Sequence, residues 1–188
     1  LDPTGHSYSQ NVGADLRYDD KAVARDLAVS LQASVMHYKE FSDAVLFPAG
    51  TRFAPSGQVF TDGMIGNPDK WEQHGRLNAS ATYTGLDDHR LRLGLGWEKE
   101  EVYRTNETKN FDPDTYQPLG TGSVADVIDV TNTAPFMKPH GRYKRYVYLQ
   151  DEWSLAADWT LTAGVRHDRY SDFGSTTNPR LALVWDAA

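Results

Sequence analysis

The stretch RYKRYVYLQDEWSLAADWTLTAGVRHDRYSDFGSTTNPRLALVW, residues 142–185, decides the fold class of this chain. Side chains alternate between the two faces of a β-strand, and the residues after position 158 alternate in the same way. One face would carry Trp159, Leu161, Ala163 and Val165, and the other Thr160, Thr162, Gly164, Arg166 and Asp168. Trp153 and Trp159 also flank a very short turn, where an aromatic belt would meet a membrane–water interface. The pattern predicts three strands of a transmembrane β-barrel wall.

The same alternation continues through the rest of the chain and predicts seven antiparallel strands in all. Their expected bounds are residues 7–18, 26–38, 76–84, 90–103, 142–155, 159–170 and 179–185. The segment 26–38 has a competing interpretation, because alanine, leucine, glutamine and lysine also favour helices. Its apolar residues recur at strict period two, however, and this favours a strand over the 3.6-residue period of a helix.

The connections between the expected strands differ in length in a regular way. Those after the first, third and fifth strands are short, whereas two of the others, residues 41–75 and 105–141, are long and irregular. Consecutive antiparallel strands reverse direction, so all the short turns would lie at one end and the long loops at the other. Outer-membrane barrels have short periplasmic turns and long extracellular loops. The sequence therefore predicts an all-β antiparallel meander, about seven strands of a transmembrane barrel.

Composition excludes several other classes. The 188 residues carry a net charge of −7 without a basic cluster, which argues against nucleic-acid binding. There is no cysteine and no run of 18 apolar residues, so disulfides and a membrane-spanning helix are not expected. The histidines lack metal-ligand spacing and no catalytic motif is present, so we predict no metal, no cofactor and no enzymatic activity. The first residues, LDPTGHSYSQ, do not resemble a signal peptide, and we expect a mature form or an internal piece.

Three segments, YVYLQDEW, WTLTAGVRHDRYSDFG and TTNPRLALVW, resemble the barrel of TonB-dependent outer-membrane receptors. The likeness is closest to the siderophore and colicin-receptor branch and is strongest over residues 145–185. It implies a plugged barrel of about 22 strands, of which seven would be only a part. It also implies uptake of a ferric siderophore or a similar scarce nutrient across the outer membrane of a Gram-negative bacterium. Outer-membrane lipid would be a partner, and TonB would be one only for the full-length receptor.

The resemblance places ligand capture in the external loops, where aromatic and cationic side chains suit anionic or catechol-rich ferric chelates. The loop candidates are Phe47, Arg52, Phe53, Phe60, Arg104, Phe111, Tyr116, Lys138, His140 and Tyr143. A second set would face the lumen or the plug: Arg92, Glu98, Gln150, Glu152, Arg166 and Asp168. For both sets the alternative is a packing role within the loops or a solvated lumen charge.

The sequence leaves alternatives for the facing of Asp151 and for the function, and it predicts how the isolated chain behaves. Strand parity places Asp151 on the apolar face, which requires either a bulge or a position in the headgroup zone. A soluble antiparallel binding module and, less favoured, an outer-membrane barrel enzyme are the alternative functions. Finally, an open sheet has two unpaired edges, so the isolated chain is expected to self-associate.

Overall fold

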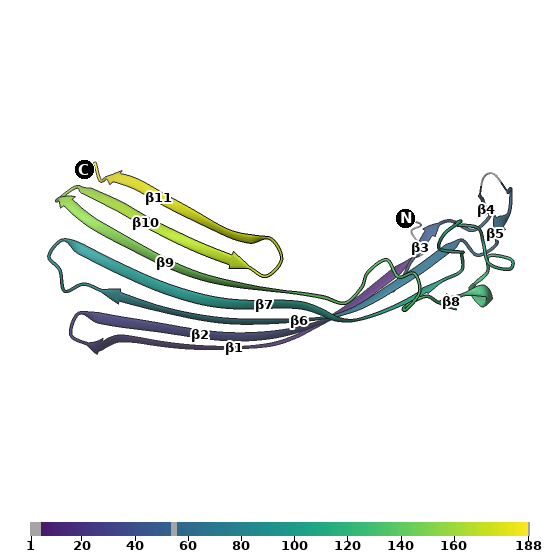
Figure 1. Ribbon diagram of the computed structural model, residues 1–188, viewed down its shortest axis with the longest axis horizontal. Helices are drawn as coiled ribbons and strands as arrows, with labels where there is room; N and C mark the ends of the chain where they lie inside the picture. Colours follow the sequence, from purple (N-terminus) through teal and green to yellow (C-terminus); the bar gives the residue numbers. More distant parts are fainter. Residues whose placement is uncertain (1–4, 54–55, 188) are drawn as a thin grey trace. The chain divides into compact units, whose positions relative to one another are not determined.

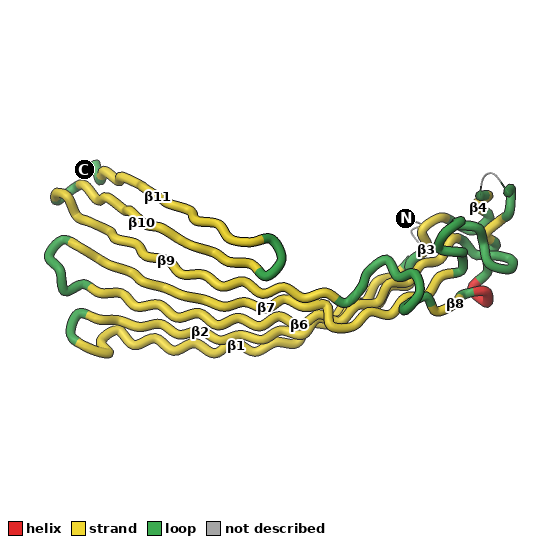
Figure 2. Tube along the Cα trace, viewed as in Figure 1, coloured by secondary structure: helices red, strands yellow, loops and turns green. Residues whose placement is uncertain are grey.

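The computed structural model describes residues 5–53 and 56–187. Seven long strands form most of the chain (Figures 1 and 2). They are β1 (His6–Ala24), β2 (Leu27–Asp43), β6 (Met64–Tyr83), β7 (His89–Lys109), β9 (His140–Ala156), β10 (Trp159–Tyr170) and β11 (Gly174–Trp185). They pair in the order β1-β2-β6-β7-β9-β10-β11, so each long strand lies beside the long strands next to it in sequence. The predicted seven-strand antiparallel meander is confirmed.

The remaining elements are short. They are β3 (Val45–Phe47), β4 (Thr51–Arg52), β5 (Val59–Phe60), the 3-10 turn η1 (Val124–Asp126) and β8 (Ile128–Asp129). β3 pairs with β6, β4 with β5, and β8 with β7. Within the described residues, no helix combines the length and the apolar character needed to cross a membrane.

The chain divides into two compact units. Each of the long strands β1, β2, β6 and β7 has residues in both units. Unit 1 comprises residues 1–12, 37–73 and 101–140, and unit 2 comprises residues 13–36, 74–100 and 141–188. Unit 1 contains the short elements and most of the irregular backbone, drawn green in Figure 2.

Unit 2 is a regular meander. Its β1–β2, β6–β7 and β9–β10 turns lie at one end of these strands, together with the end of β11 (Figure 1). Asp26 and Asp88 adopt positive φ values of 57° and 64° in two of these turns. Aspartate tolerates this left-handed conformation better than bulkier residues because its short carboxylate bonds to nearby backbone.

The two faces of unit 2 follow the predicted parity. Along β10 the apolar face carries Leu161, Ala163 and Val165, opposite Leu183, Leu181 and Pro179 of β11. The polar face carries Thr162, Gly164, Arg166 and Asp168. The apolar face is largely uncovered, with Leu16 of β1 73% exposed and Leu181 75% exposed. Such a surface needs an apolar partner outside the described chain.

The strand bounds differ from the sequence prediction mainly at the ends next to the long connections, and β1 also runs to Ala24 instead of ending at residue 18. The connection predicted over residues 41–75 contains the end of β2 and the first half of β6, and the one over 105–141 contains the end of β7 and the start of β9. The reason is that backbone hydrogen bonds extend the ladders through segments without a continuous apolar face, such as residues 67–70. β11 likewise begins at Gly174 instead of residue 179.

Candidate functional site

Apart from Tyr143, which belongs to unit 2, the residues predicted from the sequence lie in unit 1 or on the polar face of unit 2. In unit 1 the side chains of Phe60, Met64 and Phe111 form a buried cluster, with Leu46 and Phe53 packed against it. Phe60 and Phe111 are 0% exposed. The two rings are therefore not accessible to a ligand in this conformation, because the loops fold over them to remove apolar surface from water. This matches the packing role that was the alternative for these candidates.

Asn110 holds the loops of unit 1 together from the inside and is 0% exposed. Its Nδ2 donates to the carbonyl oxygens of Gly63 at 2.8 Å and Gly122 at 3.1 Å. Its Oδ1 accepts the backbone N–H of Ile65 at 2.8 Å, and its own carbonyl accepts from Leu119 at 2.9 Å. One amide thus satisfies backbone groups from two loops that are far apart in sequence.

A buried ion pair lies next to Asn110. Glu107 and Lys109 are each 2% exposed, and the Lys109 Nζ lies 3.0 Å from Glu107 Oε1. Nζ also donates to the carbonyl of Ala134 at 2.7 Å and lies 3.7 Å from the centroid of the Phe136 ring. Glu107 Oε2 accepts the backbone N–H of Phe136 at 2.5 Å. The pair ties residues 134–136 to strand β7.

Aromatic side chains that remain accessible lie over this interior. The Tyr116 ring stacks on Phe111 with 5.9 Å between centroids, and Phe136 lies 6.4 Å from Phe111. Tyr116 is 47% exposed and Phe136 is 54% exposed, so each has one packed side and one free side. Phe136 was not among the predicted residues. Its position in a loop beside Pro135 gave only the weak signal of an aromatic residue in a long connection.

The other loop candidates occupy separate positions in unit 1. The Arg104 guanidinium lies 4.4 Å from the Trp71 ring centroid, and Trp71, another residue that sequence reasoning missed, is largely buried. Arg52 in β4 pairs through its backbone with Val59 of β5. The side chains that remain exposed are Phe47, Arg52, Arg104, Lys138 and His140. With Tyr116, they are the aromatic and cationic candidates of unit 1 that remain accessible.

A short turn in unit 1 is organised by the carboxylate of Asp126. One oxygen, Oδ2, accepts from the backbone N–H and the hydroxyl of both Thr121 and Ser123, at 2.8–3.0 Å. Ser123 caps η1 in return by accepting the N–H of Ala125. These donors, the Ser123 N–H first, lower the pKa of Asp126 from 3.8 to about 2.

Acid titration is expected to open this turn at an unusually low pH. The folded pKa lies below the ordinary value, so the stabilisation is present above pH 3.8 and is lost as the pH falls through about 2. Amide hydrogen exchange at Thr121 and Ser123, read by NMR, should accelerate with a midpoint near 2, and Asp126→Ala should remove the protection at neutral pH. A midpoint at the ordinary aspartate pKa would contradict this assignment.

The polar face of unit 2 carries a ladder of paired side chains. The Arg166 guanidinium forms two bonds of 2.8 Å to the carboxylate of Asp168 and lies 3.9 Å from the Tyr146 ring centroid. The Tyr146 hydroxyl donates to Asn78 Oδ1 at 2.6 Å. Side chains from β6, β9 and β10 are thereby connected, and Asp168 is only 5% exposed.

Glu98 forms a second group on this face. Lys144 lies 2.8 Å from its carboxylate and Arg76 lies 3.5 Å away. Glu152 accepts from Gln150 at 2.9 Å. Arg92 and Gln150 line a cavity of about 220 Å³ with Arg166 and Arg180. All six residues predicted for the lumen side therefore lie in unit 2, and most are joined to a neighbour by an ion pair or hydrogen bond.

Two glycines of β7 make room for the tyrosines of β9. A Cβ at Gly96 would collide with the Tyr146 ring, and one at Gly94 would collide with the Tyr148 ring. The two rings are stacked 6.4 Å apart along β9. Tyr143, by contrast, lies outside this ladder, with the Arg145 guanidinium 5.3 Å from its ring centroid.

The structure decides the open question about Asp151. The β9–β10 ladder is continuous there, with Asp151 opposite Ala163, and its one irregularity lies at residues 159 and 160. No bulge changes the parity, so Asp151 is on the apolar face. His89 Nδ1 lies 2.7 Å from its Oδ2, and the His89 ring stacks on Trp153 at 5.2 Å. His89, next to the β6–β7 turn, therefore gives this carboxylate a polar partner on the apolar face.

Among residues 5–53 and 56–187, no group of three or more histidine, aspartate and glutamate side chains could hold a metal ion. A search of curated proteins gave no match to this chain. Residues 2–188 match the family model described as "TonB dependent receptor-like, beta-barrel". The match covers nearly the whole chain and agrees with the antiparallel meander, so the chain belongs to the TonB-dependent receptor family as part of its β-barrel.

Proposed function

We propose that this chain is part of an outer-membrane receptor of a Gram-negative bacterium that takes up a ferric siderophore or a similar scarce nutrient with energy supplied through TonB. The proposal that this chain lies in a membrane rests on the uncovered apolar face of unit 2. A row of leucines exposed at this level is stable only against lipid or an equally apolar partner. The alternating polar face then faces the barrel lumen.

The proposed ligand contacts are the accessible aromatic and cationic side chains of unit 1. Tyr116 and Phe136 offer half-exposed rings backed by Phe111, which holds them in place before a ligand arrives. Arg52, Lys138 and His140 are exposed and can approach an anionic chelate. Ring stacking and cationic contacts suit catechol or carboxylate chelates of iron.

Uptake of radioactive iron chelates by cells expressing the intact gene tests this proposal. Tyr116→Ala with Phe136→Ala is expected to weaken apparent chelate affinity about fivefold or more, because each ring contributes about 0.5–1.5 kcal/mol of stacking. Tyr103→Ala is the matched control, since Tyr103 is also accessible but lies within β7. Uptake that is independent of TonB, or equal loss in the control, would contradict the proposal.

The polar ladder of unit 2 is the proposed contact surface for the plug of the complete receptor. Arg92, Glu98, Gln150, Glu152, Arg166 and Asp168 present charges and amides on one face, which suits a polar partner more than lipid. Exchanging the charges of Arg166 and Asp168 should preserve their pairing. Loss of uptake with normal receptor abundance would then support the contact, and unchanged uptake would argue against it.

The isolated chain is proposed to self-associate. β1 and β11 are the two edges of the sheet, and among the described residues each pairs with one neighbouring strand. Unpaired edges and an apolar face both favour association with other chains. Light scattering of the isolated chain in detergent should therefore give oligomers, and a homogeneous monomer would refute the expectation.

A further inference from the structure

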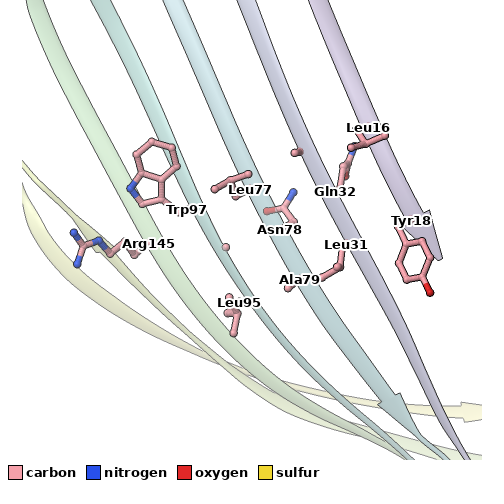
Figure 3. A pocket seen from close by; sticks show the side chains of 12 residues that line it. Leu16, Tyr18, Leu31, Gln32, Leu77, Asn78, Ala79, Leu95, Trp97 and Arg145 are labelled. Atoms are coloured by element: carbon pink, nitrogen blue, oxygen red, sulfur yellow. The ribbon is translucent and has the colours of Figure 1, made fainter. Parts of the chain in front are cut away.

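The apolar face of unit 2 is hollowed into a groove that runs across four strands. Its cavity of about 620 Å³ is lined by side chains from β1, β2, β6 and β7, among them Leu16, Leu31, Leu77 and Leu95. Figure 3 shows Trp97 and Arg145 at one side of the groove and Tyr18 at the other. The groove is lined mainly by apolar side chains, with Gln32 and Asn78 among them. A lipid-facing wall does not need a guanidinium at the rim of such a groove for its own stability.

Arg145 is not an isolated charge on this face. In the β9–β10 ladder it lies directly opposite Arg169, and both residues share the parity of Leu149 and Val165. Within the part of the chain that the structure describes, neither guanidinium has a carboxylate partner, and Arg145 contacts the Tyr143 ring. Like charges directly opposite each other in a sheet repel, so this pair favours an anion that binds both.

The position of the pair along the strands specifies where the anion would lie. Trp159 and Trp185 are opposite each other and stacked at 5.8 Å, at the end of the apolar band near the short turns. Arg169 is farther along β10 by about 33 Å of strand, or about 25 Å along the membrane normal at a tilt of about 40°. That separation equals the height of the lipid-facing band of a barrel. The two arginines therefore lie at its other boundary, where lipid headgroups begin.

We propose that Arg145 and Arg169 bind the phosphate of an anionic membrane lipid whose acyl chain lies in the groove lined by Leu16, Leu31, Leu77 and Leu95. The proposal rests on the membrane placement in the proposed function and adds a specific lipid site to it. Two guanidinium groups can bind one phosphate through paired hydrogen bonds, and neutralising their repulsion favours a phosphomonoester over a zwitterionic headgroup. The leucines supply apolar contact for the chain, and the Arg145 stem can extend along them.

Native mass spectrometry of the purified full chain in detergent tests this site. The probes are dioleoyl phosphatidic acid and dioleoylglycerol, which have the same acyl chains but differ in the phosphate. We expect retention of the first only, and at least a tenfold weaker retention in Arg145→Gln with Arg169→Gln. Arg92→Gln with Arg180→Gln is the control, because it removes the same charge from the polar face.

Further variants separate the two parts of the site. Ala79 lines the groove, so Ala79→Trp should reduce retention of the dioleoyl lipid but not of dihexanoyl phosphatidic acid. If the glutamine pair fails to fold, Arg145→Lys with Arg169→Lys supplies a second test. This variant keeps both charges and should retain most of the lipid binding. Equal retention of both probes, equal loss in the control pair, or inorganic phosphate displacing the lipid at stoichiometric concentration would overturn the proposal. The assay needs neither iron chelate nor TonB, so its failure is distinguishable from failure of uptake.

Discussion

Replacing Lys109 by methionine is expected to destabilise unit 1 by about 3–5 kcal/mol, because it leaves the buried carboxylate of Glu107 without its cation. Methionine approximates the length of the lysine stem, so packing against Phe136 should largely persist. The loss of the bond to the Ala134 carbonyl adds an unsatisfied acceptor. Hydrogen exchange of the full chain in detergent should show peptides covering residues 59–65 and 107–111 exchanging about two to four orders of magnitude faster.

Two variants control this result. Lys138→Met removes an exposed lysine from the same unit and should leave exchange within about threefold, as for most surface substitutions. Lys109→Met combined with Glu107→Gln removes both charges and should recover most of the lost protection, since the glutamine oxygen can still accept from Phe136. If the double variant were as unstable as the single one, the charge would not be the cause.

Gly96→Ala is expected to cost about 1–3 kcal/mol, although it adds one methyl group to a strand. The methyl would occupy the place of the Tyr146 ring. The ring can move away only by giving up its hydrogen bond to Asn78 and its contact with Arg166, so the polar ladder of unit 2 would be disrupted. The midpoint of urea unfolding, followed by tryptophan fluorescence in detergent, measures the loss.

Gly75→Ala supplies the matched comparison. Its added methyl would meet Trp97 at 3.7 Å, an ordinary contact, so little destabilisation is expected. In the background of Tyr146→Ala, Gly96→Ala should become nearly neutral or stabilising, because alanine favours a strand over glycine once the ring is gone. An unchanged penalty in that background would show that Gly96 is required for a reason other than the tyrosine.

The sequence predicts unit 2 well because both faces of its strands have a clear chemical identity. Alternation of Leu161, Ala163 and Val165 with Thr162 and Arg166 can be recognised locally, and a slip of one residue would reverse every side chain. Asp151, which the strand parity placed on the apolar face against this pattern, does lie on that face. What the sequence lacked was its partner, since His89 lies 62 positions earlier and meets it only through strand pairing.

Unit 1 could not be predicted to the same depth. Its strands continue through residues that do not alternate between apolar and polar side chains. The sequence therefore predicted irregular connections where the strands continue. Phe60 and Phe111 have the same residue type as a ligand-contacting ring, and only the folded loops show that they are buried. The role of Asn110 depends on carbonyls at positions 63 and 122, which no local pattern connects. Long-range packing, and not residue type, decides which loop aromatics remain accessible.

Spin-label accessibility along β10 tests whether the apolar face of unit 2 lies against lipid and its polar face in the barrel lumen. The chain has no cysteine, so single cysteines placed from position 160 to 169 can each carry a nitroxide without background labelling. In lipid bilayers, labels at Leu161, Ala163 and Val165 should collide with oxygen, and labels at Thr160, Thr162 and Arg166 with a water-soluble nickel chelate. This alternation would place the apolar face against lipid and the polar face in the barrel lumen. Equal chelate accessibility at both sets of positions would contradict this placement of the two faces.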